Sequence, residues 1–116
     1  LVNEEDDNMS DQISIDDFDE IVIKVGEIIE AEKIEKSDKL LKLQVNIGEE
    51  NPRQIVSGIA NYYSPEELIG KRVCVLANLK PAKLFGTLCE GMILATGASG
   101  ALLSPDENGE FGERIQ

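Results

Sequence analysis

The stretch that decides the fold class is Leu41-Lys42-Leu43-Gln44-Val45-Asn46-Ile47, in which apolar and polar side chains alternate at every position. A period of two is typical of a β-strand that packs one face on a core and turns the other toward solvent. Working outward, apolar runs rich in β-branched residues occupy 21–32, 53–60, 71–79 and 90–96. The sequence therefore predicts five short strands with polar turns between them.

Two short helices are predicted beside the strands. Residues 64–70 provide a serine N-cap, proline at the first helical position and glycine at the stop. At 14–18, a serine can cap a helix whose first turn holds two aspartates. Five strands with a helix between the third and fourth is the order of a small Greek-key barrel, the oligonucleotide-binding (OB) fold. We therefore predict a mainly all-β, five-stranded OB-fold barrel.

The segments between and after the strands carry weaker signals. Gly26, inside the first predicted strand, suggests a bulge or a sharp bend. Residues 80–88 are expected to form a loop between the fourth and fifth strands. The tail at 101–109 ends in Asn-Gly, which indicates further short strands around a turn.

Negative charge is concentrated at the N-terminus. The 116 residues include 23 Asp and Glu, 11 Lys and Arg and no His, for a net charge of −12, yet nine of the acids and none of the bases lie in residues 1–20. A charged stretch with few large apolar residues favours a solvated segment. We expect an acidic leader or linker at 1–13, which should repel non-specific nucleic acid, and a single binding domain at 14–116.

The composition excludes most catalytic and metal chemistry. Without His, the chain has no imidazole base for a Ser or Cys nucleophile, and two Cys cannot hold a structural zinc ion. No cofactor or metal is expected, and the chain is not expected to be an enzyme by itself. No apolar run approaches the ~20 residues that span a bilayer, so no membrane partner is expected. Cys74 and Cys89 fit a reducing compartment, which favours the cytoplasm.

Basic residues occupy the connections that border the ligand groove of an OB fold. Lys80 and Lys83 lie between the fourth and fifth strands, Lys33 and Lys39 lie between the first and second, and Arg53 begins the third. These cations could contact phosphates. Alternatively, they serve only solubility, because neighbouring acids cancel much of their field. No aromatic residue lies on an alternating strand face, so we expect RNA binding to rely on backbone and shape rather than on base stacking.

Five ordered motifs resemble one known family. They are Lys24-Val25-Gly26-Glu27-Ile28, Ser37-Asp38-Lys39-Leu40, Arg53-Gln54-Ile55-Val56-Ser57-Gly58-Ile59-Ala60, Ala77-Asn78-Leu79-Lys80-Pro81-Ala82-Lys83 and Glu90-Gly91-Met92-Ile93-Leu94-Ala95. Over about residues 14–116 the chain resembles the tRNA-binding domain at the C-terminus of bacterial methionyl-tRNA synthetases. This resemblance implies an OB fold, recognition of tRNA by shape, and a homodimer whose interface uses the N-terminal helix and the C-terminal extension.

The resemblance also implies which residues contact tRNA. Asn78, Lys80, Lys83 and Met92 match the family's tRNA-contacting segment. Where this chain has Cys89 the family usually has Ser, and a thiol is the weaker hydrogen-bond partner. The full set of predicted tRNA-contacting residues is Asn78, Lys80, Lys83, Met92, Cys89, Lys33, Lys39 and Arg53.

Two functional hypotheses follow. The first is a non-catalytic tRNA-binding and homodimerisation domain, whose parent would be an ATP-dependent methionine-tRNA ligase. Its partners would be tRNA, a second copy of the chain and the catalytic domain of the parent. The alternative is a protein-interaction module, either a dimerisation unit or a chaperone-like secretion factor, with little affinity for tRNA.

Overall fold

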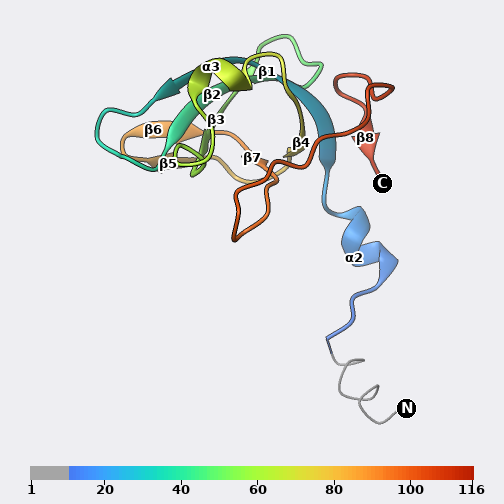
Figure 1. Cartoon of the computed structure of the whole chain (residues 1–116). Coiled ribbons are helices and arrows are strands. Elements are labelled where there is room, and N and C mark those ends of the chain that lie inside the picture. The colour runs from blue at the N-terminus through green and yellow to red at the C-terminus, as the bar shows by residue number, and fades with distance from the viewer. Residues whose placement is uncertain (1–10) are drawn as a thin grey trace.

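A strongly curved antiparallel sheet forms the centre of the computed structural model, which describes residues 11–116 (Figure 1). Its hydrogen-bonded order is β3-β2-β1-β4-β7, β8 pairs with β1, and β5 and β6 form a separate hairpin. The mainly β, barrel-like fold predicted from the sequence is confirmed, as is the helix between its third and fourth strands, but the main sheet has six strands rather than five. The elements are α2 (Ile15–Asp19), β1 (Ile23–Lys33), β2 (Leu41–Asn46), β3 (Arg53–Ser57), α3 (Pro65–Leu68), β4 (Arg72–Leu76), β5 (Ala82–Leu84), β6 (Thr87–Cys89), β7 (Met92–Ile93) and β8 (Arg114–Ile115).

The barrel closes where β3 meets the β5–β6 hairpin. Among the bonds that link these segments, the Glu90 N–H donates to the Gln54 carbonyl at 2.7 Å, and the Gln54 side-chain amide donates to the Leu88 carbonyl at 2.8 Å. Closure leaves few unpaired strand edges, which is how small barrels avoid edge-to-edge association.

The core is made by the apolar positions of the alternating strands. Leu41, Leu43 and Val45 of β2 are fully buried, and Leu68 of α3 is fully buried with them. Gly26 is also buried, but the register shift in β1 lies between Ile28 and Glu30, so the bulge does not fall at Gly26 as the sequence suggested. A Cβ on Gly26 would lie 2.8 Å from Val45 Cγ1, so the glycine is needed for close packing instead.

Hydrogen bonds fix the N-terminal helix against the end of the chain. Ser14 and Asp17 form a reciprocal capping box that begins α2, as predicted. The Arg114 guanidinium donates to the carbonyls of Asp19 at 2.8 Å and Ile21 at 3.3 Å. Figure 1 shows α2 standing off the barrel, at the same end of the molecule as β8.

Several connections differ from their prediction. The expected loop at 80–88 contains the β5–β6 hairpin, and the expected fifth strand at 90–96 shortens to β7. The tail bends at 106–109 but forms no hairpin there, because β8 pairs with the start of β1. Residues 1–10 of the predicted leader lie outside the described residues. Within 11–116, no helix has the length and apolarity needed to span a bilayer.

Candidate nucleic-acid interface

The β5–β6 hairpin turns through Phe85 and Gly86. Their φ angles are +52° and +77°, and the flanking Leu84 and Thr87 are paired. Positive φ at both central residues defines a type I′ turn, whose twist suits a two-residue hairpin. Phe85 is 60% exposed at the tip. Figure 1 shows this hairpin beside the β1–β2 connection, at the end of the barrel opposite α2.

A groove of about 600 Å³, here called the hairpin groove, lies between these two connections. Lys42 forms an ion pair with Glu32 at 2.7 Å. Lys33 and Lys36 form no ion pair with any other residue of 11–116, so the groove retains a small positive excess. Its lining consists of Glu32, Lys33, Ile34, Glu35, Lys36, Lys42, Phe85 and Thr87.

Three other predicted lysines lie outside this lining. Lys80 and Lys83 are exposed on the connection that leads into the hairpin and on β5 itself, where Lys83 pairs with Leu88. Lys39 is exposed on the β1–β2 connection. Of the predicted contact residues, the structure therefore places Lys33 in the hairpin groove, Lys39 on the β1–β2 connection and Lys83 on the β5–β6 hairpin. Lys80 lies on the β4–β5 connection, two residues after the Asn78 that holds the N-terminal segment.

Arg53 is engaged by the protein itself. Its Nη1 donates to the carbonyls of Ala77 at 2.7 Å and Glu90 at 2.9 Å, while Nε and Nη2 donate to the Glu49 carboxylate at 2.8 and 2.9 Å. Hydrogen bonding to Arg53 lowers the pKa of Glu49, and the same bond raises the pKa of Arg53. The guanidinium thus links the start of β3 to the end of β4 and to the β6–β7 connection.

Asn78 also has partners inside the chain. Its side-chain oxygen accepts the Val22 N–H at 2.9 Å, and its amide nitrogen donates to the Glu20 carbonyl at 2.7 Å. These bonds satisfy the backbone where the chain passes from α2 into β1. Asn78 therefore positions the N-terminal segment, two residues before Lys80.

Cys89 is buried in the barrel seam. Its Sγ accepts the Val56 N–H at 3.2 Å and lies 3.2 Å from the Gly91 carbonyl, to which the thiol can donate. The side chain is 8% exposed. The thiol therefore helps to hold β6 against β3.

Met92 lies in a different groove. Its side chain is 44% exposed and borders a hollow of about 360 Å³, here called the apolar groove, together with Tyr62. The Tyr62 ring covers Gly100, where a Cβ would meet the ring at 2.2 Å. The structure therefore separates Met92 from the lysines of the hairpin groove. The lining is Val56, Ser57, Gly58, Ile59, Tyr62, Met92, Ile93, Ala95, Thr96, Gly97 and Gly100.

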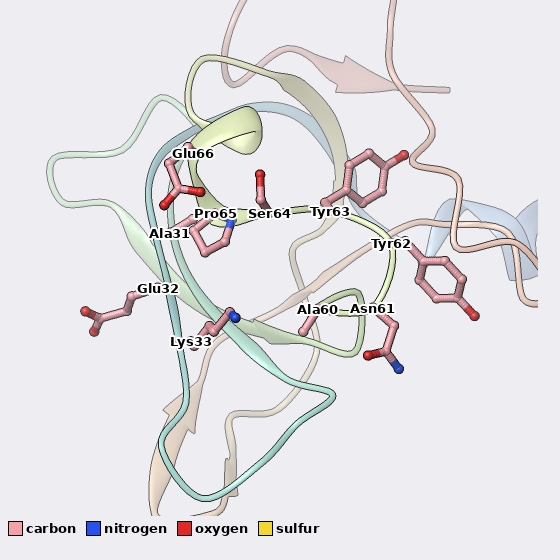
Figure 2. A pocket seen from close by; sticks show the side chains of 10 residues that line it. All are labelled: Ala31, Glu32, Lys33, Ala60, Asn61, Tyr62, Tyr63, Ser64, Pro65 and Glu66. Carbon is pink, nitrogen blue, oxygen red and sulfur yellow. The ribbon is translucent and has the colours of Figure 1, made fainter.

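A third hollow of about 600 Å³ shares Lys33 with the hairpin groove (Figure 2). Figure 2 shows Tyr62 and Tyr63 extending to the side opposite Glu32 and Glu66, so aromatic and acidic groups do not converge on one point. Residues 11–116 contain no cluster of three or more His, Cys, Asp or Glu that could bind a metal ion. Burial raises the pKa of the Cys74 thiol, which disfavours the reactive thiolate.

The residue that sequence reasoning missed is Phe85. No strand periodicity marks it, because it lies in a turn. Its only sequence signal is the following Gly86, which permits the turn conformation. The structure nevertheless places this exposed aromatic side chain in the lining of the hairpin groove.

Comparison with known proteins gives the family. Residues 23–114 match the model described as "Putative tRNA binding domain". The whole chain is 72% identical to a methionine-tRNA ligase of Methanobrevibacter smithii, of which it covers 17%. It is 60% identical over 95 residues, 80% of the chain, to a methionine-tRNA ligase of Helicobacter pylori, of which it covers 14%. The chain thus spans about one sixth of the length of these relatives.

Two solved structures share the fold over most of both chains. A MetRS related protein from Pyrococcus horikoshii superposes with a TM-score of 0.81 at 37% identity, over 90% of this chain and 98% of that one. A CsaA chaperone protein from Picrophilus torridus superposes with a TM-score of 0.82 at 30% identity, over 90% of this chain and all of that one. The chain therefore belongs to the tRNA-binding domain family whose model it matches.

Proposed function

We propose that the chain is a non-catalytic tRNA-binding and homodimerisation domain, the C-terminal appendix of a methionyl-tRNA synthetase that acts in the cytoplasm. The observation that carries the proposal is the meeting of two lysine-bearing connections at one end of the barrel. Lys33 and Lys36 line the hairpin groove there, Lys83 is exposed on β5 of the hairpin, and Lys80 is exposed on the connection that leads into β5. Clustered ammonium groups of this kind bind RNA phosphates without reading sequence.

The remaining predicted contact residues support this surface rather than form it. We assign Arg53 and Cys89 to closing the barrel, because their polar atoms already have partners in the chain. Asn78 holds the segment between α2 and β1. Met92, in the separate apolar groove, would contact tRNA only if the bound molecule extends across β3.

The double variant Lys80→Ala, Lys83→Ala tests the binding surface. Each phosphate contact contributes about 0.7–0.9 to the slope of log affinity against log salt, so we expect this slope to fall by about 1.5 and tRNA affinity to weaken. Lys71→Ala is the matched control, because Lys71 is exposed just before β4, where it lies near the Tyr63 ring. A double variant that binds tRNA with the affinity and salt slope of the unmodified chain would refute the assignment.

The dimer proposal rests on the N-terminal segment. Ile13 and Ile15 are 68% and 71% exposed, beside a helix that stands off the barrel (Figure 1). Two apolar side chains exposed together favour burial against a partner, and a second copy would offer the same surface. Linking two weak tRNA sites in one dimer raises affinity by avidity, which would strengthen the grip of the parent on its tRNA during aminoacylation.

Light scattering coupled to gel filtration tests the dimer. We expect twice the chain mass of 12.7 kDa, falling to the single mass in the variant Ile13→Ser, Ile15→Ser. Ile69→Ser is the control, since Ile69 is 56% exposed but follows α3. A monomeric unmodified chain at micromolar concentration contradicts the dimer and leaves the tRNA proposal standing.

One observation favours the alternative of a protein-interaction module. The fold is shared with a CsaA chaperone protein, and the apolar groove beside Tyr62 could accept an apolar segment of polypeptide. A competition binding assay between tRNA and an unfolded polypeptide separates the two functions. If unfolded polypeptide displaces tRNA from the chain, or if the chain binds unfolded polypeptide but not tRNA, the result supports the protein-interaction module. If Tyr62→Leu changes neither interaction, the apolar groove is not the site.

A further inference from the structure

One aromatic side chain lies at a position that its own turn does not favour. Phe85 is the one non-glycine residue of 11–116 with a positive φ, at +52°. Bulky residues rarely adopt this left-handed conformation, and a type I′ turn prefers Asn followed by Gly. The ring is 60% exposed, so core packing does not compensate for the strain. Strain of this kind, retained on a surface, suggests a functional use.

The surroundings of the ring indicate what it could bind. Phe85 borders the hairpin groove, which is also lined by Lys33 at the end of β1 and by Lys36 on the facing β1–β2 connection. Neither lysine forms an ion pair with another described residue, whereas Lys42 is neutralised by Glu32. The carboxylate of Glu35 offsets one of the two positive charges of Lys33 and Lys36. An exposed ring flanked by ammonium groups is complementary to a nucleotide, because every base has a π-face and every phosphate a negative charge.

We propose that Phe85 stacks on an unpaired base of bound tRNA while Lys33 and Lys36 contact the phosphates that flank it. This inference rests on the proposed tRNA-binding function and adds a specific requirement to it. In an A-form helix each base face is covered by its neighbours, so only a nucleotide in a loop, bulge or single-stranded end can present one. The hairpin groove therefore selects RNA that has accessible unpaired bases.

Three variants of the full chain separate stacking from a structural role. Phe85→Asn removes the ring but restores the preferred Asn-Gly turn, so it should fold at least as stably as the unmodified chain. Phe85→Trp keeps a ring and introduces the sole Trp of the sequence, whose fluorescence reports a stacked base. Phe111→Leu is the control, because it removes a ring that lies beside Arg72 and outside the hairpin groove.

The probes are an unmodified tRNA transcript and a blunt RNA duplex of similar length. One stacked base contributes about fivefold to 150-fold in affinity, so Phe85→Asn should weaken tRNA binding by at least about fivefold without changing duplex binding. Phe85→Trp should retain tRNA affinity and show quenching with tRNA only. Phe111→Leu should bind both probes as the unmodified chain does.

The outcomes distinguish this inference from the function on which it rests. If Phe85→Asn binds tRNA within twofold of the unmodified chain while Lys80→Ala, Lys83→Ala is weakened, tRNA binding stands and stacking is wrong. Equal quenching of Phe85→Trp by the duplex also overturns it, as does equal weakening by Phe111→Leu. If the unmodified chain does not bind the transcript, both proposals fall.

Discussion

Replacing Arg53 with methionine should loosen the closure of the barrel. The variant keeps most of the aliphatic stem but removes the two Nη1 bonds to the carbonyls of Ala77 and Glu90, at 2.7 and 2.9 Å. It also removes the ion pair with Glu49 at 2.8 Å. The Arg53 side chain is only 22% exposed, so water replaces these bonds incompletely.

The magnitude follows from the two kinds of contact. A hydrogen bond from a charged donor contributes about 1.5–3 kcal/mol, so the two carbonyl bonds together contribute about 3 kcal/mol at the lower limit. The Glu49 carboxylate is 39% exposed, and an ion pair that accessible adds at most about 1 kcal/mol. We therefore expect Arg53→Met to lower the free energy of unfolding by about 3–4 kcal/mol, and Glu49→Gln by less than about 1 kcal/mol.

Urea unfolding followed by far-ultraviolet circular dichroism measures both losses. The urea concentration at the unfolding midpoint should fall strongly for Arg53→Met and slightly for Glu49→Gln. The slope of the unfolding free energy against urea concentration should be unchanged in both variants. If Arg53→Met is no less stable than Glu49→Gln, the carbonyl bonds do not hold the barrel and this reasoning fails. The same variant, assayed for tRNA where it remains folded, tests the phosphate contact expected from the sequence, because our assignment predicts near-normal binding.

Three further perturbations follow from the packing and the charges. Gly26→Ala places a Cβ 2.8 Å from Val45 Cγ1 and should cost about 1–3 kcal/mol by overpacking; an unchanged thermal midpoint would contradict it. Cys89→Val preserves volume but leaves the Val56 N–H without its acceptor, so it should lose about 1–3 kcal/mol, whereas Cys89→Ser should stay within about 1 kcal/mol of the unmodified chain. Because Arg53 lowers the pKa of Glu49, that stabilisation is present above the ordinary glutamate pKa of about 4.3 and is lost as the pH falls toward the lowered value. Unfolding titrations from pH 6 to pH 3 should therefore show a shallower acid loss in Glu49→Gln, and identical curves would exclude the linkage.

The elements that the sequence predicted well are those with local signals. The alternation of β2 places Leu41, Leu43 and Val45 in the core, because a strand has only two faces and one must be apolar. The α3 helix follows from Ser64, Pro65 and the acids of its first turn. Such signals lie within a few residues of one another, so periodicity and capping rules detect them.

What the sequence could not show depends on residues far apart in the chain. Arg53 looked like a free cation at the start of a strand, but its carbonyl partners lie 24 and 37 residues away and meet it only when the barrel closes. Cys89 looked like a loop residue, because its partner Val56 is 33 residues distant. The hairpin around Phe85 was missed for a different reason: three-residue strands are too short for a detectable period, and Phe is atypical of its turn.

The hydrogen bonds from Asn78 and Arg114 to the N-terminal segment also determine at which end of the barrel another polypeptide can be joined to the domain. They bring the first described residues and the last strand to one end of the barrel, with the β5–β6 hairpin at the other (Figure 1). A polypeptide joined through either of these segments would thus lie at the end of the barrel opposite the hairpin. An attached protein would therefore leave the hairpin groove, where we propose that RNA binds, accessible to solvent.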